Sequence, residues 1–237
     1  MAGSERETRM TAEHDERGGR RGGETLDERL ARHRAALAAC RRCGLHAVHG
    51  SLPIVSVARA PRVMLVGQAP GRTEVRDGRP FLGAAGRTLF RWLAQAGVDE
   101  ATVRERIYIA AVTRCYPGPS PSGRGDRVPS PAERSACAGW LEAELRLIRP
   151  ALLIPVGRLA IDALVGPRPL AEVVGRAHDV THASGSSVAV PLPHPSGASS
   201  WVHAPGHRVL LDGALALLRD ELAALGLAGP ASAERVA

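Results

Sequence analysis

The stretch that decides the fold of this chain is VMLVGQAPG, residues 63–71. Its first four residues are apolar and predict a short buried β-strand, and the residues that follow predict a tight loop. Gly67 and Gly71 let the backbone approach a ligand closely, and Pro70 stiffens the turn. In open α/β sheets, ligands bind at the carboxyl ends of the parallel strands. The stretch therefore predicts an α/β protein with a site directly after this strand.

Short apolar segments alternate with longer amphipathic segments along the rest of the chain. Further strands are expected at residues 106–112, 151–156 and 188–192. Helices are expected at residues 26–40, 131–148, 157–164 and 207–225, with another that carries Leu89 and Leu93 and ends at Gly97. Such alternation is typical of parallel βαβ units. We therefore expect a three-layer α/β/α sandwich around a four-stranded parallel sheet.

The length of 237 residues suits one α/β domain, which we place at residues 26–228. Residues 1–25 mix charges and glycines with few groups able to form a core, so a disordered tail is expected there. Residues 229–237 are expected to be loose. No apolar stretch approaches the roughly 18 residues of a membrane span, and the start lacks the apolar core of a secretory signal. We expect a cytoplasmic, monomeric protein.

The charge balance is basic: 31 Lys and Arg residues face 24 Asp and Glu residues, for a formal net charge of +7. All of these basic residues are arginines, whose guanidinium groups bind phosphates bidentately. Codon bias explains much of that count in a chain so rich in Ala, Arg, Gly and Pro. The sign of the charge still favours a nucleic-acid partner.

Four cysteines stand at Cys40, Cys43, Cys115 and Cys137, the first two as a C-x2-C pair. Because disulfides are disfavoured in the cytosol, thiols at this spacing more often bind a metal. Zinc and an iron–sulfur cluster both accept four cysteines, and spacing alone does not choose between them. Unpaired or redox-active cysteines are the alternative. The segment at residues 115–130 is rich in Pro, Gly, Ser and Arg and is expected to form a loop.

Two further motifs lie in loops that follow expected strands. Residues 78–86, GRPFLGAAG, carry Phe81, and residues 193–197, PHPSG, carry His194. Together with Glu74 and the loop at residues 67–71, they resemble the motifs of the uracil-DNA glycosylase superfamily, nearest to its family four. The resemblance extends over residues 30–225.

The resemblance implies a monofunctional DNA glycosylase that hydrolyses the N-glycosidic bond of uracil, or of a related deaminated base, in base excision repair. Its partner is DNA, from which the base must leave the stack and enter a pocket. No lyase step is expected, because the chain has no lysine to form a Schiff base. Family four also carries a structural [4Fe-4S] cluster, and the four cysteines stand in the matching order, with zinc as the less favoured cofactor.

The resemblance assigns roles to three residues. Phe81 stacks on the flipped base, a contact that contributes about 1–3 kcal/mol in comparable sites. Glu74 orients the attacking water and stabilises the positive charge that develops on the sugar. The ring of His194 donates a hydrogen bond to the departing base. Without the resemblance, Phe81 is better explained as a core residue, Glu74 as a solvated carboxylate and His194 as an ordinary histidine.

Further site residues follow from the same motifs. The base-binding positions are Gly67, Gln68, Ala69, Phe81 and Ala111, and the DNA-binding positions are Ser196, Gly197 and Ser199, with Trp201 or Val202 near the vacated stack. Ala69 stands where family one has its catalytic Asp, which leaves Glu74 as the acid of this motif. Ala111 stands where family four has an Asn that binds the uracil edge, so we expect weaker discrimination of uracil from other bases.

Two other functions remain open from the sequence. The first is a non-catalytic DNA-damage-binding module with a structural metal cluster. In that case the replacement of the family Asn by Ala111 would have accompanied a loss of turnover. A nucleotide-binding α/β protein would use the loop at residues 67–71 as a phosphate cradle. That loop lacks the G-x-G-x-x-G spacing and the lysine of a P-loop, which argues against the second alternative.

Overall fold

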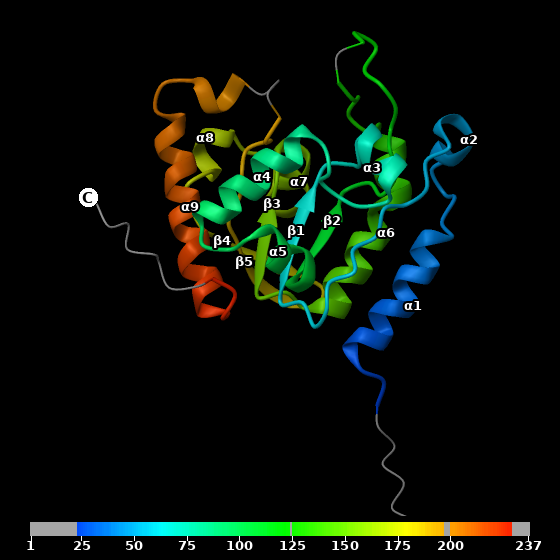
Figure 1. Ribbon diagram of the computed structural model, residues 1–237, viewed down its shortest axis with the longest axis horizontal. Helices are drawn as coiled ribbons and strands as arrows, with labels where there is room; N and C mark the ends of the chain where they lie inside the picture. Colours follow the sequence, from blue (N-terminus) through cyan, green and yellow to red (C-terminus); the bar gives the residue numbers. More distant parts are fainter. Residues whose placement is uncertain (1–22, 124, 197–199, 229–237) are drawn as a thin grey trace, which may run out of the picture.

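The computed structural model describes residues 23–123, 125–196 and 200–228, and its centre is one five-stranded sheet (Figure 1). The strands are β1 (Val63–Gly67), β2 (Ile107–Ala111), β3 (Leu152–Pro155), β4 (His178–His182) and β5 (Gly185–Ala189). They lie in the order β2-β1-β3-β5-β4. β1 pairs in parallel with β2 and β3, and β3 pairs in parallel with β5. The expected tails at residues 1–22 and 229–237 lie outside the described residues.

The sequence predicts four parallel strands, and β4 corrects that number to five. This strand pairs antiparallel with β5 at the edge of the sheet. Its sequence, HDVTH, has one buried residue, Val180, so it lacks the continuous apolar run of a central parallel strand. Because β5 pairs with β4 from Gly185 onward, β5 also begins and ends three residues earlier than expected.

The helices are α1 (Leu26–Ala38), α2 (Leu45–His49), α3 (Arg72–Asp77), α4 (Ala84–Gln95), α5 (Glu100–Arg106), α6 (Pro131–Ile148), α7 (Arg158–Leu164), α8 (Leu170–Val173) and α9 (His207–Ala224), with a 3-10 turn η1 (Ser200–His203). The expected helices are all present, and α6 has the predicted bounds. It begins with a capping box between Ser130 and Glu133. The helices α2, α3, α5 and α8 were not predicted, since none exceeds seven residues and so none repeats a helical pattern.

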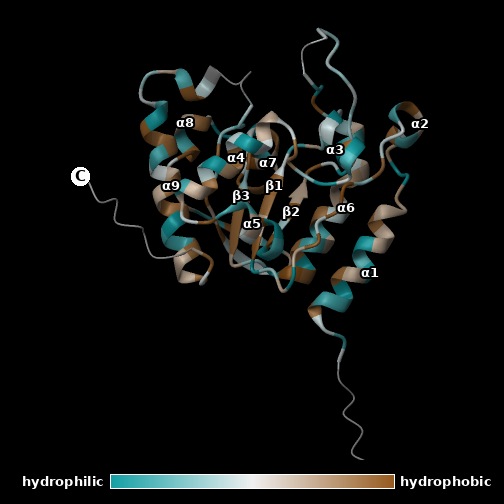
Figure 2. Ribbon diagram, in the orientation of Figure 1, coloured by the Kyte–Doolittle hydropathy of each residue, from teal (hydrophilic) through white to brown (hydrophobic). Residues whose placement is uncertain are grey.

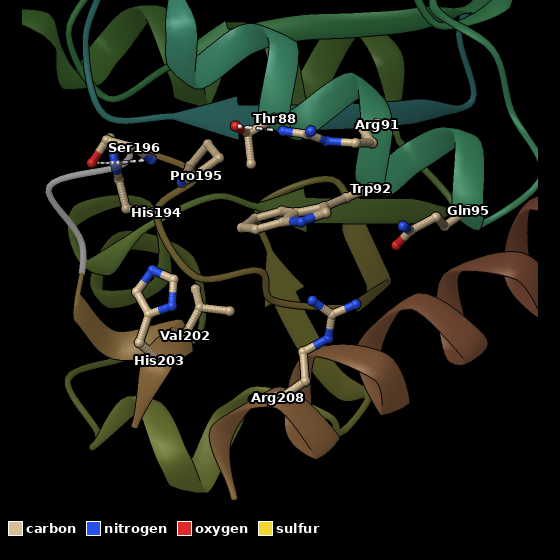
Figure 3. Close-up of a pocket in the computed structure, with 10 residues that line it drawn as sticks. All are labelled: Thr88, Arg91, Trp92, Gln95, His194, Pro195, Ser196, Val202, His203 and Arg208. Atoms are coloured by element: carbon tan, nitrogen blue, oxygen red, sulfur yellow. Dashed lines mark hydrogen bonds between the residues drawn. The ribbon is translucent and has the colours of Figure 1, made fainter. Parts of the chain in front are cut away.

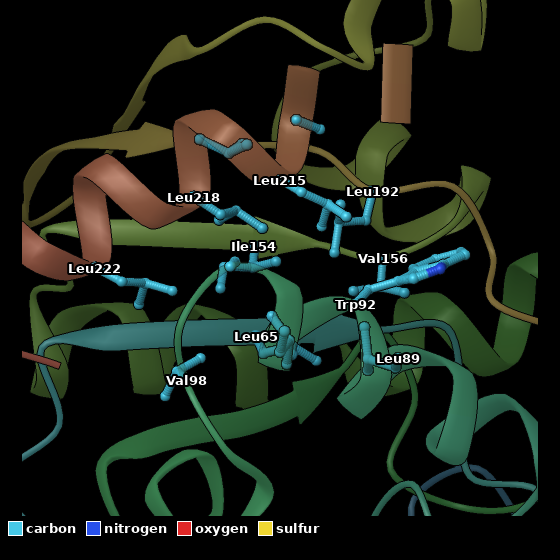
Figure 4. Close-up of a cluster of buried hydrophobic side chains, with 14 of the residues drawn as sticks. Leu65, Leu89, Trp92, Val98, Ile154, Val156, Leu192, Leu215, Leu218 and Leu222 are labelled. Atoms are coloured by element: carbon cyan, nitrogen blue, oxygen red, sulfur yellow. The ribbon is translucent and has the colours of Figure 1, made fainter. Parts of the chain in front are cut away.

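Two hydrophobic clusters cover the two faces of the sheet. Alternate residues of β1 point to opposite faces, so Leu65 packs with α4 and α9, whereas Met64 packs with α1 and α6. Figure 4 shows the first cluster, in which side chains of α4 and α9 meet over the sheet. Figure 2 shows hydrophobic strands enclosed by helices of mixed character. The three layers confirm the predicted α/β/α sandwich.

The described helices include none that is long and apolar enough to cross a membrane.

The second hydrophobic cluster surrounds a buried ionic network centred on Glu144 of α6. The carboxylate pairs with Arg114, accepts a hydrogen bond from the hydroxyl of Tyr108 (2.8 Å) and lies 3.2 Å from Nε2 of His33. Burial raises the pKa of Tyr108, so its hydroxyl stays protonated and donates. Charges at this depth are tolerated only when they are paired. The network therefore joins α1, β2 and α6 on one face of the sheet.

We expect Glu144→Ala to lower the free energy of unfolding by about 3–5 kcal/mol, because it leaves the buried guanidinium of Arg114 without its carboxylate. The control is Glu142→Ala in the same helix, whose side chain is 65% exposed. Its cost should be at most about 0.5 kcal/mol. Urea unfolding of both variants at neutral pH measures the difference. A cost below about 1 kcal/mol for Glu144→Ala would show that the network does not hold these elements together.

Candidate active site

A cavity of about 460 Å³ opens at the carboxyl ends of the parallel strands. The loops after β1, β2 and β5 bound it, because parallel strands end at the same edge of a sheet. The register places Ala111 of β2 opposite Gly67 of β1. The residues singled out in the sequence that line the cavity are Gly67, Gln68, Ala69, Glu74, Phe81, Ala111, His194 and Ser196. The two other predicted DNA-binding positions, Gly197 and Ser199, lie outside the described residues.

Phe81 has a strained backbone at the wall of this cavity. Its φ of +56° lies in the left-handed region, which bulky residues rarely adopt. Arg104 of α5 supports this conformation by donating hydrogen bonds to the carbonyls of Pro80 (3.0 Å) and Phe81 (3.4 Å). The ring lies against Gly67, where a Cβ would come within 2.9 Å of Phe81 Cζ. A glycine at the end of β1 therefore leaves the space that the ring occupies.

Glu74 is 8% exposed, and its carboxylate binds backbone N–H groups. Oε2 accepts from Gly71 (2.9 Å), and Oε1 accepts from Leu82 (3.0 Å) and Gly83 (3.3 Å). These bonds fasten the loop after β1 to the loop that carries Phe81. A carboxylate has about four acceptor positions, so about one remains for a water. The contacts give Glu74 a positioning role, and the catalytic role stays a prediction.

The imidazole of His194 is held in one tautomer by Ser196. The backbone N–H of Ser196 donates to Nδ1 (3.3 Å), and the Ser196 hydroxyl lies 2.9 Å from the same nitrogen. Because a backbone N–H can only donate, Nδ1 accepts and Nε2 carries the proton. Burial lowers the pKa of His194, which keeps the ring neutral at neutral pH. The cavity wall thus contains an uncharged N–H donor.

Gln68 has a fixed backbone and an unengaged amide. Its carbonyl accepts a hydrogen bond from the N–H of Thr113 (3.1 Å), which ties the loop after β1 to the loop after β2. Within the part of the chain that the structure describes, its side chain makes no hydrogen bond. The neighbouring Ala69 and Ala111 contribute only methyl groups. The amide of Gln68 is therefore available to a ligand in the cavity.

A second cavity, of about 380 Å³, shares His194 and Ser196 with the first (Figure 3). Arg91 and Trp92 of α4 line it together with Arg208 of α9. The site therefore continues into a neighbouring hollow in which guanidinium groups accompany an aromatic ring. Such chemistry suits an anionic strand with exposed bases.

The four cysteines come from the end of α1, the turn before α2, the loop after β2 and the first part of α6. All are free thiols, with Cys115 and Cys137 buried and Cys40 and Cys43 half-buried. Burial raises the pKa of Cys115 to about 12, and the nearby Cys43 adds to the effect ahead of Cys137 and Cys40. Nε1 of Trp140 donates to Sγ of Cys40 (3.2 Å). The thiols are thus close enough to influence one another.

Four cysteine thiols are the ligands that zinc and iron–sulfur groups use in proteins. A metal cation stabilises the thiolate form, which burial alone makes unfavourable. Among the described residues, however, no group of three or more His, Cys, Asp or Glu side chains is arranged to enclose a metal ion. The cysteines therefore fit such a group by their chemistry, whereas the described side chains do not enclose a metal ion.

The sequence profile of the uracil DNA glycosylase superfamily matches residues 55–211. The chain belongs to this superfamily. It is 30% identical over 157 residues to the type-4 uracil-DNA glycosylase of Thermotoga maritima, covering 66% of this chain and 76% of that protein. It is 38% identical over 122 residues to the type-4 enzyme of Archaeoglobus fulgidus (51% and 56% covered). It is 35% identical over 115 residues to the type-5 enzyme of Thermus thermophilus (44% and 49% covered). The predicted family is confirmed.

Sequence reasoning missed two residues of this candidate site. Arg104 reaches the Phe81 loop from α5, a helix that carries no motif. Asp126 lines the cavity from the long loop after β2, a segment with no hydrophobic pattern to place it. No signal in the sequence marks either residue, because only the packing of distant segments brings them to the site.

We expect Gly86→Ala to destabilise the protein by about 1–3 kcal/mol, because the carbonyl oxygen of Phe81 occupies the space of the new Cβ. An unhindered Gly→Ala change instead stabilises by about 0.4–1 kcal/mol. The control is Gly213→Ala in α9, where the nearest atom would lie 3.8 Å from the Cβ. Thermal unfolding gives the sign for each variant. Stabilisation by Gly86→Ala would contradict the close packing of α4 under the Phe81 loop.

Proposed function

We propose that this protein excises uracil from DNA as a monofunctional glycosylase, hydrolysing the N-glycosidic bond and leaving an abasic site for base excision repair. The observation that carries the proposal is His194, a neutral imidazole with its proton on Nε2, which lines the same cavity as Phe81. Membership of the superfamily and the glycosylase relatives support it.

The cavity supplies the groups that a flipped pyrimidine requires. The ring of Phe81, held against Gly67, offers a face on which the base stacks. The unengaged amide of Gln68 offers a donor and an acceptor for the polar edge of the base. Because Arg104 and Glu74 hold the loop in place, these groups are positioned before the base arrives.

His194 stabilises the departing base. Cleavage of the bond between the sugar C1′ and the base leaves negative charge on the base, concentrated on its carbonyl oxygen. A neutral Nε2–H aimed at that oxygen stabilises the anion without competing for its own proton. At a pH below the lowered pKa of His194, the ring gains a proton on Nδ1 and becomes charged. This nitrogen then no longer accepts the hydrogen bond from the N–H of Ser196. We therefore infer that this tautomer acts at neutral pH.

The DNA strand continues from the first cavity into the second. Ser196 stands between the two, and Arg91 and Arg208 offer cations for the flanking phosphates. Val202 also lines the second cavity, so it is better placed than Trp201 to meet the vacated stack. The predicted roles of Gly197 and Ser199 in binding DNA remain part of this proposal. We also keep the cytoplasmic location, the monomeric state and the loose tails as predictions.

Ala111 sets the expected breadth of the substrate range. Its methyl group faces the cavity where an amide would make two hydrogen bonds to the base edge. Losing such contacts weakens the rejection of other bases, so hypoxanthine or xanthine are candidates beside uracil. The same residue is the one observation that favours the second candidate function, a DNA-damage-binding module without turnover.

The cysteines are proposed to hold a structural [4Fe-4S] cluster, with zinc as the less favoured metal. Cys40, Cys43, Cys115 and Cys137 would be its ligands, and Trp140 would donate a hydrogen bond to the sulfur of Cys40. When bound, the cluster ties the end of α1 to α6 and supplies no step of the hydrolysis.

The function is tested with labelled oligonucleotides that carry one uracil, hypoxanthine or xanthine, single- and double-stranded, followed by alkali cleavage. We expect cleavage at uracil, and His194→Ala should slow single-turnover excision by about 10²–10³-fold because a donor to the leaving anion is lost. The control is His178→Ala in the edge strand β4, which should leave the rate unchanged. Tight DNA binding without release of any base would favour the non-catalytic module.

The cofactor is tested by metal analysis and absorption of the purified protein. We expect a brown protein that absorbs broadly at about 400 nm and contains about four iron atoms per chain. Cys43→Ala should lose both signals because one of four ligands is removed, whereas Trp140→Phe keeps every ligand and should retain the iron. A colourless protein with stoichiometric zinc would overturn the iron–sulfur assignment.

A further inference from the structure

A second carboxylate, Asp126, reaches the cavity from the loop after β2. This loop folds back on itself, with Pro119 bridged to Asp126 and the N–H of Arg127 bonded to the carbonyl of Gly118 (3.0 Å). The fold of the loop brings Asp126 to Gly71 in the loop after β1. A Cβ on Gly71 would lie 2.9 Å from Oδ2 of Asp126 and 2.7 Å from Oε2 of Glu74. The two carboxylates are therefore neighbours across Gly71.

The two carboxylates differ in what they bind. Glu74 is buried and uses three acceptor positions on backbone N–H groups. Asp126 is exposed, and its carboxylate lies beside the hydroxyl of Tyr116 and the guanidinium of Arg72. Among the residues that line this cavity, these two are the acids. Asp126 therefore offers the carboxylate that is open to a water molecule.

Asp126 has two polar neighbours. Tyr116 and Arg72 lie beside it, and the Tyr116 hydroxyl is buried without a hydrogen-bond partner in the described part of the chain. Asp126 therefore has a phenol and a guanidinium as neighbours, and both groups are able to donate hydrogen bonds.

We propose that Asp126 accepts the proton of the attacking water, while Glu74 holds the two loops that shape the site. This inference rests on the proposed glycosylase function. The bond between C1′ and N1 of uracil breaks, and its electron pair goes to N1. The water oxygen bonds to C1′, and the proton that it loses goes to Asp126. The uracil anion, bound by His194 Nε2–H, later takes a proton from solvent, and Asp126 returns its own to solvent.

The test compares Asp126→Asn, Asp126→Ala and Glu74→Gln with the full-length wild-type protein on single-uracil DNA. Asp126→Asn keeps the size of the side chain and removes its basicity, so single-turnover excision should slow by about 10²-fold or more. Its DNA affinity and melting temperature should match the wild type. Sodium formate should restore part of the activity of Asp126→Ala. Asp179→Asn, exposed on β4, is the control and should remain fully active.

Glu74→Gln separates the two roles. In this variant an NH2 group replaces one carboxylate oxygen that accepts hydrogen bonds from backbone N–H groups. Because a donor then faces a donor, the melting temperature of Glu74→Gln should fall. Formate should not restore the activity of this variant. Asp126→Asn with a rate within about threefold of the wild type would overturn the inference. The inference would also be overturned if the loss of rate in the Asp126 variants were matched by a loss of DNA affinity or of melting temperature, and if formate did not restore the activity of Asp126→Ala. A wild-type protein that releases no base would instead overturn the proposed function, and this inference with it.

Discussion

The parallel pairing of β1 with β2 and β3 is the constraint on which the rest of the structure depends. The register places Gly67 beside Ala111 and Val66 beside Pro155, so the chain leaves each of these strands at the same edge of the sheet. Loops that are distant in the sequence then have to share the space above that edge. The cavity with Phe81, Glu74 and His194 is the result.

The loops around the cavity are held by hydrogen bonds between side chains and the backbone. Phe81 accepts an unfavourable φ because Arg104, Glu74 and the absence of a side chain at Gly86 together fix its loop. His194 is fixed in its tautomer by a backbone N–H two residues later. Groups fixed in this way need little rearrangement when substrate binds, which is the main physical means by which enzymes stabilise developing charge.

One short segment after β2, residues 114–116, connects the cavity with the buried ionic network and the cysteines. Arg114 lines the cavity and pairs with Glu144 beneath the other face of the sheet, and Cys115 follows directly. Tyr116 then lies beside Asp126 at the cavity wall. These three consecutive residues therefore tie the buried network, the cysteines and the site to the end of one strand. A change in any of them is expected to reach the others through this backbone.

The sequence by itself determined the elements whose signals are local. Residues 63–66 are apolar because β1 is buried on both faces, Ser130 and Glu133 mark the start of α6 because they cap it, and the motifs around Phe81 and His194 identify the superfamily. The tertiary structure alone decided the features that arise between distant segments. An edge strand such as β4 carries no continuous apolar run, and the approach of Asp126 to Gly71 depends on how a patternless loop folds over its neighbours. Local patterns record which face of an element is buried, whereas the position of one loop against another is set by packing that no short stretch of sequence encodes.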